Sequence, residues 1–154
     1  MLVWLFLFIF VFMWYYKEQI IDCLEKIPIS AIGFIYKITK LDDYKFYIGK
    51  KQIYTNRRTK ITQKEKLETG NNRKKFKIVT KESDWLTYNS SCLELKKEIK
   101  ELGEGRFIKE ILEFCFDKRD LNYKEVRWQF LLEVLEKNTY NGNILNRFFR
   151  EKET

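Results

Sequence analysis

Two tyrosines on two short apolar runs are the residues of this chain best placed to do chemistry. The stretch 33–49 reads GFIYKITKLDDYKFYIG, with Tyr36 in the first run, Tyr47 in the second and Gly49 at its end. If both side chains point to one face of a hairpin, their hydroxyls converge, and a phenol can donate a hydrogen bond or act as a base. An unperturbed tyrosine titrates at about pH 10, so a tyrosine base needs a cation or metal that lowers its pKa.

Much other chemistry is excluded by what the chain lacks. It contains no histidine, which removes Ser-His-Asp and Cys-His catalysis and the usual zinc hydrolase sites. Its cysteines are far apart, odd in number and form no CxxC pair, which indicates a reducing compartment rather than a disulfide scaffold. No GxxxxGK[ST] phosphate loop is present. Catalysis must therefore use Tyr, Lys, Arg, Asp or Glu.

The charge of the chain favours a polyanionic partner. The formal net charge is +8 and the isoelectric point about 9.3, which points to nucleic acid first and to an anionic membrane surface second. Residues 50–81 hold twelve Lys or Arg against two Glu. We interpret them as a long basic insertion, partly helical near 53–68, and a solvated charge run is the alternative. The candidate nucleic-acid-binding residues are Lys50, Lys51, Arg58, Lys60, Arg73, Lys74 and Lys75.

The elements that position these residues follow from hydrophobic periodicity. We expect strands at 32–39, 44–48 and 107–116, the first two forming an antiparallel hairpin, and helices at 17–27, from Ser90 or Ser91 to about 102, and from Asp120 to about 137. Glu94 is placed as the capping-box partner of Ser91. The chain thus predicts an α+β domain with a small three-stranded antiparallel sheet flanked by helices.

The uncharged segment 1–16 is open to three interpretations. It is an appended extension before a domain whose working start is Met13, a short membrane anchor, or an ordinary core helix. We therefore divide the chain into residues 1–16, an apolar extension or possible membrane segment, and residues 17–154, one domain with the basic insertion at about 50–81.

The hairpin resembles the signature of the GIY-YIG nuclease superfamily, through GFIY at 33–36 and YIG at 47–49. Members carry an Arg ten residues after the second tyrosine, on a helix, and Arg57 stands there. A Phe-x-x-x-Ile-Leu strand follows in the family, and here it is 107–112. A helix then bears the metal-binding Glu with an aromatic three residues later, matched by Glu125 and Trp128. A final Asn is matched best by Asn141, with Asn143 as second choice. The sequences YIGKK and VTKESDW are similar to those of small phage-encoded members. The resemblance as a whole covers about residues 13–150.

This resemblance implies an endonuclease of a phage or mobile element, such as a homing endonuclease, that hydrolyses DNA with Mg²⁺ or Mn²⁺. It implies that Glu125 binds the metal, Arg57 holds the nonbridging phosphate oxygens and Asn141 orders the site. Tyr36 would take the proton from water, and Tyr47 would hydrogen-bond the phosphate or orient the water. The expected location is the cytoplasm of the host cell, with a membrane-anchored form through residues 1–16 as the alternative.

One departure from the family concerns the general base. Many members carry a His four residues after the Arg, where this chain has Ile61. We expect Lys50 or Lys51 to supply cationic stabilisation instead. The missing His also favours the alternative function, a nucleic-acid-binding module of the same fold that is catalytically weak or does not cut.

Overall fold

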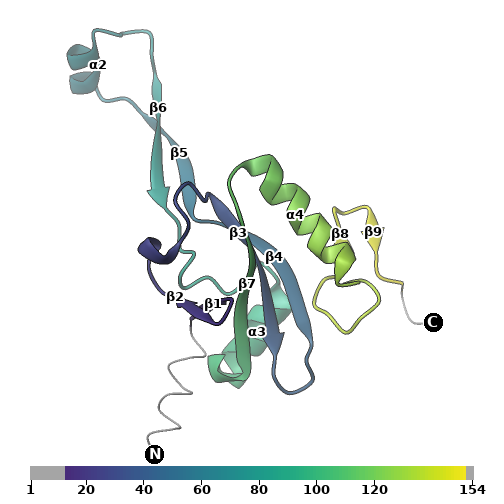
Figure 1. Cartoon of the computed structure of the whole chain (residues 1–154). Coiled ribbons are helices and arrows are strands. Elements are labelled where there is room, and N and C mark those ends of the chain that lie inside the picture. The colour runs from purple at the N-terminus through teal and green to yellow at the C-terminus, as the bar shows by residue number, and fades with distance from the viewer. Residues whose placement is uncertain (1–12, 152–154) are drawn as a thin grey trace, which may run out of the picture.

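A mixed five-stranded sheet forms the body of the protein, and the computed structural model describes residues 13–151 (Figure 1). Its strand order is β2-β1-β7-β3-β4, with bounds β1 Trp14–Tyr16, β2 Gln19–Ile21, β3 Gly33–Lys40, β4 Phe46–Gln52 and β7 Phe107–Cys115. The other strands are β5 Tyr54–Lys60, β6 Phe76–Glu82, β8 Asn143–Ile144 and β9 Phe148–Phe149. The helices are α2 Gln63–Thr69, α3 Leu93–Leu102 and α4 Lys118–Leu131, with short 3₁₀ turns η1 Leu24–Lys26 and η2 Glu104–Arg106.

The α+β class is confirmed, but the sheet has five strands, not three, and is not wholly antiparallel. β1 pairs parallel to β7, and β2 pairs antiparallel to β1. Trp14 is fully buried, and its indole N–H donates to the Trp85 carbonyl at 2.8 Å. Residues 14–16, which the sequence analysis grouped with the apolar extension, therefore belong to the sheet. Residues 1–12, the rest of that segment, lie outside the described residues. Within 13–151, no helix is long and apolar enough to cross a membrane.

The helix expected at 17–27 is wrong. Lys17 and Glu18 adopt left-handed backbone angles, φ 45° and 67°, and form a two-residue turn that joins β1 to β2. Ile21 is buried at the sheet, and among residues 13–27 only η1 is helical. The apolar residues of this short segment fit the helical period and the strand period equally. Pairing with β1, which itself pairs with the remote β7, decides for the strand.

The hairpin of β3 and β4 is confirmed, and it divides the core between two faces. Phe34 and Tyr36 share a buried cluster with Leu95 of α3, whereas Ile35 shares another with Leu121 of α4. Because successive strand side chains alternate, β3 is buried on both faces and α3 and α4 cover opposite sides of the sheet (Figure 1). Both motif tyrosines point to the α3 side, with ring centroids 6.0 Å apart.

Both long helices begin differently from the prediction. The α4 cap is Asp117, not Asp120, since the Asp117 carboxylate accepts from the Asp120 N–H at 2.8 Å, and the helix ends at Leu131. The capping box of Ser91 and Glu94 does not form, because Glu94 pairs with Lys45 at 2.6 Å. At α3 an ion pair with the remote Lys45 thus takes the Glu94 carboxylate that the predicted cap would use, whereas α4 keeps a local cap.

The basic segment folds as a ribbon and not as the helix expected near 53–68. β5 and β6 pair antiparallel over seven residues each, and α2 is confined to Gln63–Thr69 at the tip (Figure 1). β-branched residues at Thr55, Thr59 and 78–80 favour extended backbone, which outweighs the charge pattern. Arg57 accordingly lies on a strand.

Gly49 is required by the close approach of Tyr36. The two residues are cross-strand partners, and a Cβ at position 49 would lie 2.6 Å from the Tyr36 hydroxyl oxygen. The Tyr36 ring is fully buried between aromatic neighbours and has no room to retreat. The glycine of the second motif therefore exists to admit the tyrosine of the first.

We expect Gly49→Ala to lower the free energy of unfolding by about 1–3 kcal/mol, the usual cost of overpacking a dense core. Urea unfolding followed by circular dichroism measures it. Gly105→Ala is the matched control, because nothing lies within 4 Å of a Cβ built there. Equal stability of the two variants would contradict the close-approach argument.

Candidate active site

The candidate site is a cleft of about 430 Å³ between the edge of β4, helix α4, the start of α3 and the loop after residue 138. Its lining is mostly polar. Residues from four separate parts of the chain meet there, namely Tyr47, Lys50, Ser91, Cys92, Glu125, Gln129, Tyr140, Asn141, Gly142, Asn143, Leu145 and Asn146. Three of the five catalytic residues predicted from sequence line this cleft, Tyr47, Glu125 and Asn141.

The two motif tyrosines have different surroundings. Tyr47 is half-buried and lines the cleft, with its hydroxyl 3.2 Å from the Ser91 hydroxyl. Tyr36 is fully buried behind it and does not line the cleft. Burial raises the pKa of Tyr36 well above 10, and the neighbouring Tyr47 and Tyr88 phenols add to the shift. The pKa of Tyr47 is also raised, chiefly by burial.

These pKa directions describe the protein chain without a metal. The expected role of Tyr36 as a base depends on a metal that lowers its pKa, and in the chain alone that pKa is raised. Without a metal, Tyr36 therefore holds its proton at neutral pH and is a hydrogen-bond donor.

Glu125 is poised beside a cation supplied by the chain itself. The Lys50 ammonium lies 2.7 Å from Glu125 Oε2 and donates to Asn122 Oδ1 at 2.9 Å. Asn122 and Glu125 are three residues apart on α4, so both oxygens face one side of the helix. The Glu125 side chain is 18% exposed, which leaves part of the carboxylate open to the cleft.

Asn141 completes the exposed edge of β4. Its carboxamide oxygen accepts from the Ile48 N–H and its amide donates to the Ile48 carbonyl, both at 2.9 Å. β4 is an edge strand, so these groups have no neighbouring strand to pair with. Gln129 of α4 also donates to the Ile48 carbonyl, at 3.4 Å. Asn141 thereby fixes the backbone between Tyr47 and Gly49.

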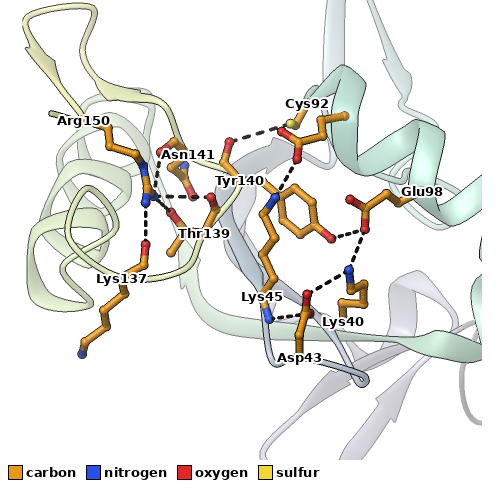
Figure 2. Close-up of polar contacts among 11 residues, drawn as sticks. Lys40, Asp43, Lys45, Cys92, Glu98, Lys137, Thr139, Tyr140, Asn141 and Arg150 are labelled. Atoms are coloured by element: carbon orange, nitrogen blue, oxygen red, sulfur yellow. Dashed lines mark hydrogen bonds and ion pairs between the residues drawn. The ribbon is translucent and has the colours of Figure 1, made fainter. Parts of the chain in front are cut away.

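The loop that carries Asn141 is held from both sides (Figure 2). Arg150 donates to the Val134 carbonyl at 2.7 Å and the Lys137 carbonyl at 2.8 Å, and it also contacts the Asn141 carbonyl. On the other side, the Tyr140 hydroxyl donates to Glu98 of α3 at 2.7 Å. The position of Asn141 is thus set by hydrogen bonds on both sides.

Arg57 is not brought to the cleft. It is exposed on β5 opposite Val79, and no residue of β5 lines the cleft. Of the predicted nucleic-acid-binding residues, Lys50 is engaged by Glu125, and Lys51 pairs with Asp84 at 2.5 Å and lies over the Tyr88 ring. The other five are exposed on the ribbon or its connecting loop, namely Arg58, Lys60, Arg73, Lys74 and Lys75.

Sequence reasoning missed four residues at the cleft or behind it. Asn122 and Gln129 flank Glu125 at three and four residues on α4, a spacing that places all three on one helix face and could have revealed them. Ser91 was predicted only as a cap. Arg150 gave no signal, because its partners are backbone carbonyls and the Thr139 hydroxyl, which no sequence motif links to it.

Comparisons with known proteins gave one match. The model of a family described as "Putative endonuclease segE, GIY-YIG domain" matches residues 14–149. No curated protein matches the chain, and no solved structure matches it.

We expect Asn141→Ala to destabilise the protein by about 2 kcal/mol, because it leaves a buried N–H and carbonyl of Ile48 with fewer partners. Thermal and urea unfolding measure the loss. Asn143→Ala is the control, since Asn143 accepts only an exposed hydrogen bond from the Asn146 N–H. A control as damaging as Asn141→Ala would argue against the edge contact.

The burial of Tyr36 predicts a loss of stability in alkali. Its folded pKa lies above the unfolded value of about 10, so its contribution is complete below pH 10 and declines as pH rises. We expect Tyr36→Phe to reduce the slope of unfolding free energy above pH 10 by up to about 1.4 kcal/mol per pH unit. Urea unfolding at several pH values tests this. Tyr123→Phe, at a position 64% exposed, should leave the slope unchanged.

Proposed function

The chain belongs to the GIY-YIG nuclease family, and we propose that it is a divalent-metal-dependent endonuclease that hydrolyses phosphodiester bonds in DNA. The observation that carries the proposal is the meeting of Tyr47, Lys50 and Glu125 in one polar cleft, secured by Asn141. A carboxylate, an ammonium and a phenol in one cleft supply a metal ligand, a phosphate donor and a hydrogen-bond donor. The negative charge of DNA complements the formal net charge of +8 on the chain.

The donor set fits Mg²⁺ or Mn²⁺ held by few protein ligands. Mg²⁺ keeps several waters and is commonly bound by one or two carboxylates together with substrate phosphates. Glu125 Oε2 and Asn122 Oδ1 already converge on the Lys50 ammonium, so the cleft accommodates a cation at these oxygens. Among residues 13–151, no three His, Cys, Asp or Glu side chains gather into a metal cage, which agrees with a ligand set completed by water and phosphate. When bound, the metal would neutralise phosphate charge and lower the pKa of water.

The residues of the chain then have separate tasks. Lys50 donates to a nonbridging phosphate oxygen, and Tyr47 donates a hydrogen bond to the phosphate or to the attacking water. Tyr36, protonated and buried, positions Tyr47 and Gly49 and is not the base. Asn141 holds the backbone of β4. Arg57 contacts DNA from the ribbon, in place of the scissile-phosphate role that the family resemblance implies.

The cellular setting follows from this substrate. We propose that the enzyme acts in the cytoplasm of the host cell, where DNA is accessible. Cys23, Cys92 and Cys115 are all free thiols, which supports a reducing compartment.

A second function, DNA binding without cleavage, is favoured by one observation. Arg57 lies outside the cleft, and the Glu125 carboxylate is paired with Lys50. The following experiment separates the two functions.

We expect Glu125→Gln to abolish Mg²⁺-dependent nicking of supercoiled plasmid, because the metal loses its only charged protein ligand in the cleft. DNA affinity, measured by fluorescence anisotropy in EDTA, should stay within about threefold of the unmodified protein, since one charge changes. Glu136→Gln removes the same charge at an exposed site and should cut normally. Cleavage retained in Glu125→Gln would refute the metal assignment, and no cleavage by the unmodified protein would favour the binding function.

A further inference from the structure

The β5–β6 ribbon contributes no residue to the cleft in which the proposed reaction takes place. It forms a separate two-stranded sheet and projects beyond the body, with α2 at its tip (Figure 1). Its base is fixed: Ile53 is fully buried, and the Ser83 N–H donates to the Ile53 carbonyl at 2.8 Å. The ribbon is therefore a presented surface with an anchored base.

Charge is concentrated on this ribbon. Residues 54–82 hold ten Lys or Arg against three Glu, so they carry nearly all of the chain's formal net charge of +8. Two of the Glu are engaged within the protein, Glu65 with Lys77 and Glu82 with the Trp85 indole. The charge complement of this surface is a nucleic acid backbone.

The side chains on one face of the ribbon make specific contacts with one another, which a run of independently solvated charges would not do. Cross-strand partners share a face, which places Asn56 with Thr80 and Arg58 with Ile78. The Thr80 hydroxyl donates to the Asn56 carboxamide oxygen at 2.8 Å, which orients the amide. The Arg58 guanidinium lies 4.1 Å from the centre of the Phe76 ring. Ile78 stands on the same face between Phe76 and Thr80 of β6, and it is 72% exposed.

Basic residues of the loop before β6 lie beside this same face. Arg58, Phe76 and Ile78 line an open concavity of about 870 Å³ together with the connecting loop residues Arg73, Lys74 and Lys75. An amide, a guanidinium and an exposed aliphatic group thus lie beside a row of cations.

We propose that this face of the ribbon enters the major groove of duplex DNA and recognises bases through Asn56, Arg58 and Ile78. The proposal rests on DNA being the substrate of the nuclease. A two-stranded ribbon fits the major groove, which is about 12 Å wide. Asn pairs with adenine, Arg with guanine, and apolar groups contact the thymine methyl. Arg73, Lys74 and Lys75 would bind phosphates and set the register.

This assignment goes beyond attraction of the basic segment to the phosphate backbone, which carries no sequence information. It gives the ribbon two parts, a reading face on the strands and a phosphate-binding loop. Substitutions in the two parts must then have different signatures.

The test is selection of bound sequences from a random duplex library in EDTA, followed by affinity measurements against salt. Arg58→Lys keeps the charge but loses the forked donor, so we expect the preference at one base position to disappear and the preferred site to weaken about five- to hundredfold. The salt dependence should be unchanged. Lys74→Ala should weaken all sequences equally and reduce the slope of log affinity on log salt by about 0.9.

Asn56→Ala is the second variant and should lose the preference at another position. Binding in EDTA separates this test from catalysis: a protein that selects sequences but never cuts refutes the nuclease proposal alone. Absence of any sequence preference, or a preference unchanged in Arg58→Lys and Asn56→Ala, overturns the reading face. Tighter binding to an RNA duplex would also overturn it, because the major groove of A-form helices is too narrow.

Discussion

The structure of the cleft depends on how the open edge of β4 is satisfied. A strand at the edge of a sheet presents unpaired N–H and carbonyl groups, and here the Asn141 carboxamide pairs with both groups of Ile48. The side chain of Asn141 thus makes the two hydrogen bonds that a neighbouring strand would make to Ile48. Ile48 stands between Tyr47 and Gly49, so the loop near the C-terminus decides where the second motif lies. Arg150 and the Tyr140–Glu98 hydrogen bond transmit that constraint to the rest of the fold.

The two tyrosines of the hairpin are chemically distinct because β3 is central and β4 is not. Tyr36 stands on β3, between β7 and β4, and is covered by aromatic rings. Tyr47 stands on the edge and reaches the cleft. Burial favours the neutral phenol in both cases. In the reaction proposed above, the acceptor of the proton from water would therefore come with the metal and the substrate, and the protein would contribute hydrogen-bond donors and fixed positions.

Local sequence signals were sufficient where structure is local or the motif is short. The β3–β4 hairpin, β7 and the apolar side of α3 follow from periodicity, and the family resemblance supplied Glu125 and Asn141 in the cleft. The failures involve partners remote in sequence. β1 joins β7 across more than ninety residues, and Lys50 of β4 meets Glu125 of α4 across seventy-five residues. A charge-rich segment has too few apolar residues to show the period of a strand or of a helix. This is why β5 was expected to be partly helical.

The anchoring of the ribbon at Ile53 and Ser83 has a consequence for how such proteins diversify. The chain leaves the body at Ile53 and returns to it at Ser83, and a hydrogen bond joins these two residues. The segment between them is therefore connected to the body at one place. The closure cost of such an excursion grows only slowly with its length. Natural variants can therefore lengthen, shorten or replace the ribbon without disturbing the cleft. If the ribbon recognises DNA as proposed, one nuclease body could in this way acquire new DNA targets through changes confined to a single segment.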